Sequence, residues 1–203
     1  WNIALDAVPG ELTLDVLEVR RDASSESDLN KTLVVKIVPD LQAITDWNNA
    51  NPNADPLSLF TTYTNDASNP FDGTAWTLTF NPGEFVKYIK IKFDPTAMDF
   101  SKRNVIPFKV TDASGAQISN GASAALVEVA VKNKYDGVYM LTGSLVDYAS
   151  ASLGPVDQEV ALITTGANTV KMIPLDLGIE GHLINSAGAL SYYGSYGPVF
   201  TFD

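Results

Sequence analysis

The sequence predicts an all-β protein, and the clearest evidence lies between Trp76 and Phe93. Apolar and polar residues alternate there in two runs, 76–80 and 85–93, which flank the tripeptide Asn81-Pro82-Gly83. Alternation with a period of two is the pattern of half-buried strands. Pro82 and Gly83 suit the two corners of a type II turn. We therefore expect a β-hairpin at the centre of the fold, with these apolar residues of the second run facing inward: Phe85, Ile89, Ile91 and Phe93.

Similar alternation predicts about seven strands in residues 1–132, the number typical of a β-sandwich. Residues 12–21 should form a strand with a β-bulge near Val16, because the apolar face shifts there by one residue. One short helix should follow Asp40, since Leu41 and Ile44 recur at helical spacing, and we expect it to be the longest helix of the chain. The other expected strands span 32–38, 57–64, 104–111 and 124–131.

A second all-β unit is expected over residues 133–203, after the boundary Lys132-Asn133-Lys134. Its strands should include 135–148, 159–164 and 169–174, with Gly166, Ala167 and Asn168 as a hairpin loop. The final residues 198–203 alternate like a strand still in progress, and the preceding residues offer it no obvious partner. Because closing a barrel usually takes about eight strands, we expect this unit to be truncated and the natural chain to continue beyond Asp203.

Composition restricts the function. The net charge of −11 and the pI near 4.4 argue against nucleic acid and anionic lipid as partners, because both need a basic surface. The absence of cysteine excludes disulfides and thiolate chemistry, and a single histidine, His182, argues against a histidine-based triad or zinc site. No apolar run approaches the roughly 18 residues needed to span a bilayer. We expect no enzyme activity, no catalytic residues, no metal site and no cofactor.

Two pairs of segments resemble known families. FNPGEFVKYIKIKFDP and IPFKVTDASGAQIS resemble a Calx-β/immunoglobulin-like sandwich, and more closely the domain of unknown function that opens many Bacteroidetes surface lipoproteins. NKYDGVYMLTGSLVDYA and TTGANTVKMIPL resemble the lipocalin-like β-barrel domain that follows it in those proteins. Together the resemblances cover nearly all of the chain. They imply an exported, lipid-anchored protein of the outer membrane and cell surface, without enzyme activity, whose signal and anchoring cysteine have been removed.

The resemblance also raises calcium binding, because Calx-β domains bind calcium through clustered acidic residues. Glu84 matches one such position, and Glu11 and Asp72 are further candidates. The paired aspartates expected near the end of the domain are missing between Asp112 and Val131. Since Ca²⁺ takes six to eight oxygen ligands, we expect no tight calcium site.

Exposed aromatic residues are the candidate ligand contacts. Tyr192, Tyr193 and Tyr196 lie in SYYGSYGP, where they could form a flat platform for sugar rings or pack along a barrel rim. Trp47 is held in reserve as a further candidate for ligand contact. Its alternative role is to pack in the core, as a tryptophan in a helix more often does. The prediction is a surface-exposed adhesion or binding lipoprotein whose ligand is a carbohydrate or another cell-surface molecule. The alternative is a structural spacer or accessory subunit of an outer-membrane glycan-uptake complex.

Overall fold

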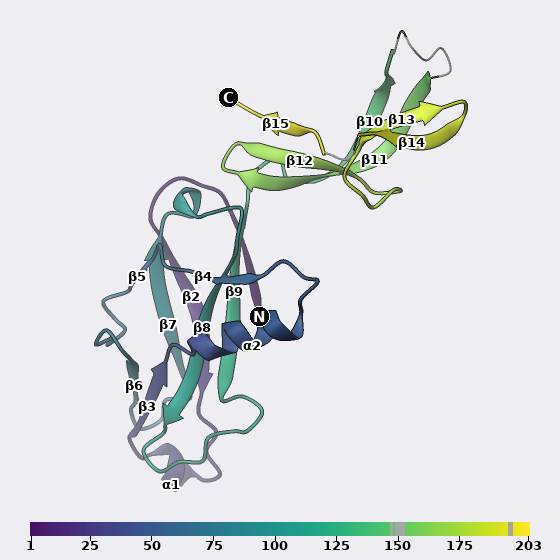
Figure 1. Cartoon of the computed structure of the whole chain (residues 1–203). Coiled ribbons are helices and arrows are strands. Elements are labelled where there is room, and N and C mark those ends of the chain that lie inside the picture. Colours follow the sequence, from purple (N-terminus) through teal and green to yellow (C-terminus); the bar gives the residue numbers. More distant parts are fainter. Residues whose placement is uncertain (147, 149–152, 195–196) are drawn as a thin grey trace. The chain divides into compact units, whose positions relative to one another are not determined.

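The computed structural model describes residues 1–146, 148, 153–194 and 197–203. The chain divides into two compact units, Trp1–Ala130 and Val131–Asp203, which we call unit 1 and unit 2 (Figure 1). The boundary predicted from the sequence, after residue 132, lies two residues beyond this observed boundary after Ala130. Each unit is described by itself.

Unit 1 is a sandwich of two sheets, and the predicted all-β class is confirmed. The larger sheet has the order β1-β9-β8-β3-β6, and β4 pairs with β8. The smaller sheet has the order β2-β7-β5. The bounds are β1 Asn2–Asp6, β2 Leu12–Arg20, β3 Leu33–Val38, β4 Leu57–Leu59, β5 Thr64–Asn65, β6 Trp76–Phe80, β7 Val86–Phe93, β8 Arg103–Asp112 and β9 Ala124–Lys132.

The core of unit 1 lies between the two sheets. Alternate residues of β6 and β7 are buried there, as the sequence predicted for Ile89, Ile91 and Phe93. Phe85, also expected inside, is exposed just before β7 begins. The centre of the core is aromatic: the Trp76 ring lies 5.2 Å from that of Phe108, and the indole Nε1 donates to Asn65 Oδ1 over 2.7 Å.

The predicted hairpin is wrong, although its turn is formed. The amide of Glu84 donates to the carbonyl of Asn81, and Gly83 has φ +84°. However, β6 pairs with β3 in the larger sheet, whereas β7 pairs with β2 in the smaller one. The turn therefore carries the chain from one sheet to the other. Alternation shows which side chains are buried and does not show which strand is the neighbour.

The predicted bulge in β2 is confirmed. The register of β2 against β7 shifts between Asp15 and Leu17, with Val16 buried between them. Before the bulge, Leu12 and Leu14 belong to the inward phase. After the bulge, Leu17 and Val19 point inward instead, so the strand keeps an apolar inner face although the alternation has shifted by one residue.

Helix α2, Leu41–Ala50, covers the outer face of the larger sheet beside β8 (Figure 1). Ile44 packs against Leu57 and Val105 there, which explains why β8 is buried on both faces. As predicted, α2 is the longest helix among the described residues. Asp40 precedes it but makes no side-chain capping bond.

Four features of unit 1 were not predicted. A short helix, α1 (Glu26–Leu29), forms in the polar loop after β2, with Ser25 Oγ accepting from the Asp28 amide. The expected strand 57–64 is divided between β4 and β5, which belong to different sheets. Strand β1 adds to β9: the amino group of Trp1 donates to the carbonyl of Leu126, and the amide of Glu128 donates to the carbonyl of Trp1. Trp1 thus donates to one residue of β9 and accepts from the residue two positions further along, which is the pattern of parallel strands. A 3-10 turn, η1, spans Pro95–Ala97.

Unit 2 is a sheet with the order β14-β13-β11-β12-β15, and β10 pairs with the other edge of β11. Its final strand, expected to lack a partner, pairs with β12, where Val199 lies opposite Lys171. Within the described part of unit 2, β10, β14 and β15 each pair with one strand, so these strands form an open sheet. The bounds are β10 Gly137–Ser144, β11 Leu153–Gly166, β12 Thr169–Pro174, β13 His182–Ser186, β14 Ala189–Tyr193 and β15 Val199–Thr201.

Candidate ligand-binding surface

Strand β14 carries two of the three predicted tyrosines at the edge of unit 2. Tyr192 is 46% exposed and Tyr193 is 54% exposed. They are consecutive residues of one strand, opposite Leu183 and His182 respectively, so they belong to opposite faces of the sheet. The two rings therefore do not form one flat platform. Tyr196 lies outside the described residues.

Tyr192 lies against a glycine that admits its ring. A Cβ atom at Gly181 would lie 2.8 Å from Cβ of Tyr192 and 3.0 Å from its ring atom Cδ2. Real Cβ atoms essentially never approach other atoms that closely, so a larger residue at position 181 would displace the tyrosine. Gly181 thus fixes where the exposed ring stands.

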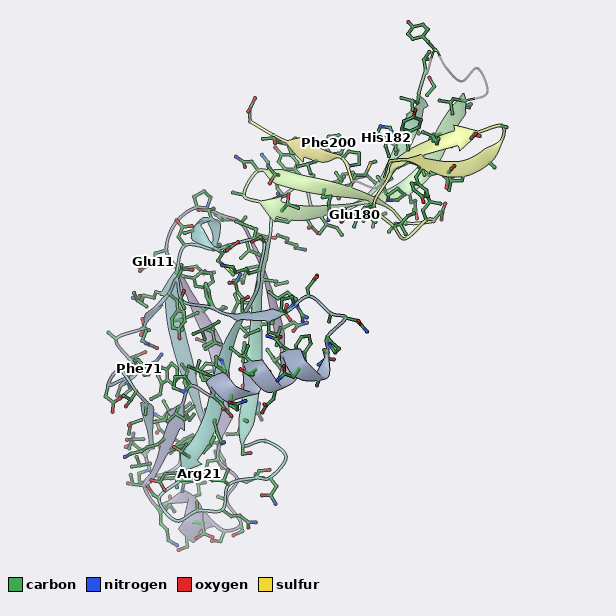
Figure 2. The ribbon with its side chains drawn as sticks, in the orientation of Figure 1. Glu11, Arg21, Phe71, Glu180, His182 and Phe200 are labelled. Carbon is green, nitrogen blue, oxygen red and sulfur yellow. The ribbon has the colours of Figure 1, made fainter. Side chains whose placement is uncertain are left out.

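An ion pair adjoins the same glycine. Nζ of Lys171, on β12, donates to Oε1 of Glu180, the residue before Gly181 (Figure 2). The bond to Lys171, helped by the amide of Gly197, lowers the pKa of the Glu180 carboxyl. Glu180 is therefore ionised at neutral pH. We call Lys171, Glu180, Gly181 and Tyr192 the Tyr192 surface.

The Tyr192 surface combines three kinds of contact that suit a sugar. The phenol ring offers an aromatic face to the C–H groups of a pyranose. Glu180 can accept hydrogen bonds from hydroxyl groups, and Lys171 can donate them. A few placed polar groups beside an apolar contact are the usual means of fixing a ligand's orientation. Lys171 and Glu180 could not be recognised from the sequence, because they are ordinary charged residues until folding pairs them.

Trp47 lies elsewhere, on α2 of unit 1. Its ring is partly buried against the cluster of Ile44, Leu57 and Val105, and Cζ of Arg103 lies 4.8 Å from its centroid. Nε and Nη2 of Arg103 each donate to the carboxylate of Glu128 over 2.8 Å. These two bonds hold the guanidinium over the ring of Trp47. This arrangement places Trp47 in the packing of α2 on the sheet.

The acidic residues considered for calcium are engaged separately. Glu84 bonds to Lys87 and to the amide of Asn81, and Asp72 accepts from Thr74 and the Ala75 amide. Glu11, labelled in Figure 2, precedes the end of the β2–β7 ladder at which Leu12 pairs with Phe93, whereas Glu84 lies just before the opposite end, at Val86. The part of the chain that the structure describes contains no cluster of three His, Asp or Glu side chains suited to a metal.

His182 lies at the start of β13, where Nδ1 is 3.2 Å from the carbonyl oxygen of Leu183. Among the described residues, no helix is long and apolar enough to cross a membrane.

Comparison with known proteins gives a match by structure alone. No protein-family model and no curated protein matches the chain. A multidomain protein including DUF1735 from Bacteroides ovatus has a TM-score of 0.59 at 16% identity, over 85% of this chain and 55% of that one. A protein of unknown function from the same species has a TM-score of 0.58 at 14% identity, over 95% and 65%. An auxiliary nutrient binding protein from Bacteroides thetaiotaomicron has a TM-score of 0.56 at 13% identity, over 85% and 59%.

Identities this low show a shared fold only. The chain spans between about half and two thirds of the length of these three structures. All three come from Bacteroides, which agrees with the resemblance to Bacteroidetes proteins stated above. The lipocalin-like nature of unit 2 stays a prediction.

Proposed function

We propose that this protein is a non-enzymatic binding protein of the bacterial cell surface, held there by a lipid anchor, which recognises carbohydrate through the Tyr192 surface. The observation that carries the proposal is an exposed tyrosine ring that lies against Gly181, the residue after Glu180, whose carboxylate is ion-paired with Lys171. The structural similarity to an auxiliary nutrient binding protein supports a role in capturing nutrients. The acidic character of the chain favours a neutral or cationic ligand over a polyanion.

A second candidate function is that of an accessory subunit or spacer in an outer-membrane glycan-uptake complex. The exposed apolar residues Val138 and Met140 on β10 favour it, because β10 pairs on one side only among the described strands. Exposed apolar groups beside an unpaired strand edge are typical of protein contact sites. Adhesion to a host molecule would use the same surfaces.

The test is affinity electrophoresis of the purified chain in gels that contain single polysaccharides, after a glycan array has identified a ligand. Replacing Tyr192 by alanine should weaken binding by about 1–3 kcal/mol, on the scale of aromatic stacking on nucleobases. The control is Tyr139→Ala, which removes an exposed tyrosine from β10 and should leave affinity unchanged. Thermal unfolding of all variants shows whether each remains folded.

Two results would contradict the carbohydrate proposal. One is an array on which the wild-type chain binds no glycan, in which case the accessory-subunit role becomes the better explanation. The other is a Tyr192→Ala variant that loses several degrees of thermal stability and no affinity, since that outcome would make the ring a packing residue.

A further inference from the structure

Unit 1 contains a cavity of about 530 Å³ at the end of the sandwich near α1. Strand β2 forms one wall, and β3, β8 and the beginning of β9 form the opposite wall. Most of the lining is apolar: Leu17 belongs to the β2 wall, and Val35 and Phe108 belong to the opposite wall. The exposed loop 114–122 and the charged residues 18, 20 and 22 line its rim. A volume of this size is within the range of small-molecule sites.

A buried cation, Arg21, is among the residues that line this mostly apolar space. Arg21 is only 7% exposed, and its Nη2 donates to the carbonyl oxygen of Asp28 in α1 (Figure 2). Its Nη1 is buried and has no hydrogen-bond partner among the described residues. Asp22, the adjacent carboxylate, is exposed and forms no ion pair with it. Glu18, also at the rim, is bonded to Arg20 and Tyr88.

The bulge at Val16 explains how a charged residue came to lie inside. It moves the inner face of β2 to the odd-numbered positions, so the alternation that buries part of Leu17 and Val19 continues to Arg21. The amide of Arg21 still bonds to the carbonyl of Phe85, which extends the ladder by one residue. The side chain therefore continues the inner face of the strand.

A buried arginine with an unpaired nitrogen needs an acceptor. Arginine remains protonated in proteins, and leaving a buried charged donor without a partner costs free energy. The planar guanidinium is best matched by a carboxylate, and the apolar walls are best matched by a hydrocarbon body. A phosphate dianion would suit the site poorly, because the lining is mostly apolar, Arg21 is its buried cation, and Arg20 at the rim is already paired with Glu18.

We propose that this cavity binds a small organic monocarboxylate, with its carboxylate on Nη1 of Arg21 and its apolar body between Leu17 on one wall and Val35 and Phe108 on the other. This site lies in unit 1 and is separate from the Tyr192 surface of unit 2. It takes a different class of ligand, so it does not depend on the carbohydrate proposal.

The test uses sodium octanoate as the probe, 1-octanol as the neutral analogue, and NMR titration of the full chain. Octanoate should bind saturably at one site and shift the methyl resonances of Val35 and Val110, which line the cavity. Octanol should bind about tenfold more weakly or worse, because it lacks the charge-assisted bond. The Tyr192 resonances should not move.

Three variants complete the test. Arg21→Met removes the charge, keeps an unbranched side chain, and should reduce octanoate affinity to that of octanol. Lys109→Met removes the same charge from an exposed residue of β8 between two lining residues, and should leave affinity unchanged. Ala125→Leu fills part of the cavity and leaves Arg21 in place, and should abolish binding even if Arg21→Met does not fold. No saturable binding, equal affinity for octanoate and octanol, or full affinity in Ala125→Leu would overturn the proposal.

Discussion

Trp47 provides the sharpest test of whether an aromatic residue of this chain packs or binds. In the structure its ring fills the space between α2 and the larger sheet and lies beneath the Arg103 guanidinium. Replacing a fully buried tryptophan by alanine costs about 3–5 kcal/mol. Trp47 is partly exposed, which lowers this figure, and the lost cation–π contact adds about 0.5–1 kcal/mol. We expect Trp47→Ala to lower the free energy of unfolding by about 3 kcal/mol.

Urea unfolding followed by far-UV circular dichroism measures this change without relying on tryptophan fluorescence. The matched control is Leu41→Ala on the same helix, where the side chain is 55% exposed. It should change the free energy of unfolding by no more than about 0.5 kcal/mol. If Trp47→Ala behaves like the control and also loses glycan binding, Trp47 is a ligand contact and the packing argument is refuted.

Two further predictions concern acid and calcium. Two aspartates have pKa values lowered to about 2 from an ordinary value of 3.8. The side chain of Ser68 is the main cause for Asp66, and the hydroxyl of Thr74 is the main cause for Asp72, with backbone amides adding to both. A carboxylate with a lowered pKa stabilises the fold above pH 3.8, and this stabilisation is lost as the pH falls through 2. The urea midpoint of the wild-type chain should therefore fall between about pH 4 and pH 2. In Asp72→Asn the midpoint should fall less steeply over the same range. A variant that falls as steeply as wild type would contradict this. Thermal unfolding should not respond to millimolar calcium or chelator; a gain of about 2.7 kcal/mol, expected at a hundredfold excess over Kd, would reveal a calcium site.

Sequence periodicity predicted the faces of strands better than their partners. Ile89, Ile91 and Phe93 are buried as expected, because alternation depends only on the local pleat. The pairing of β6 and β7 was wrong, because a turn with Pro82 and Gly83 has the same local geometry whether it joins two paired strands or crosses between sheets. Strand partners depend on contacts distant in sequence, which no local pattern records.

The residues of the candidate binding sites were only partly predictable, for a similar reason. Tyr192 could be found as an aromatic residue among glycines, but its polar neighbours Glu180 and Lys171 meet only after β12 and β13 have folded into one sheet. Arg21 could have been found by continuing the shifted alternation of β2 one step beyond Val19. It was overlooked because a charged residue is normally assigned to the exposed face.

The parallel pairing of β1 with β9 also bears on how unit 1 responds to force. In the proposed role the protein would experience drag between its anchor and its ligand. If the chain is pulled at Trp1 and at the end of β9, the load runs along two strands that point the same way, so it acts in shear. The hydrogen bonds between them then carry the load together, whereas antiparallel terminal strands pulled from one end would separate one bond at a time. Unit 1 is thus built to resist traction along its own length.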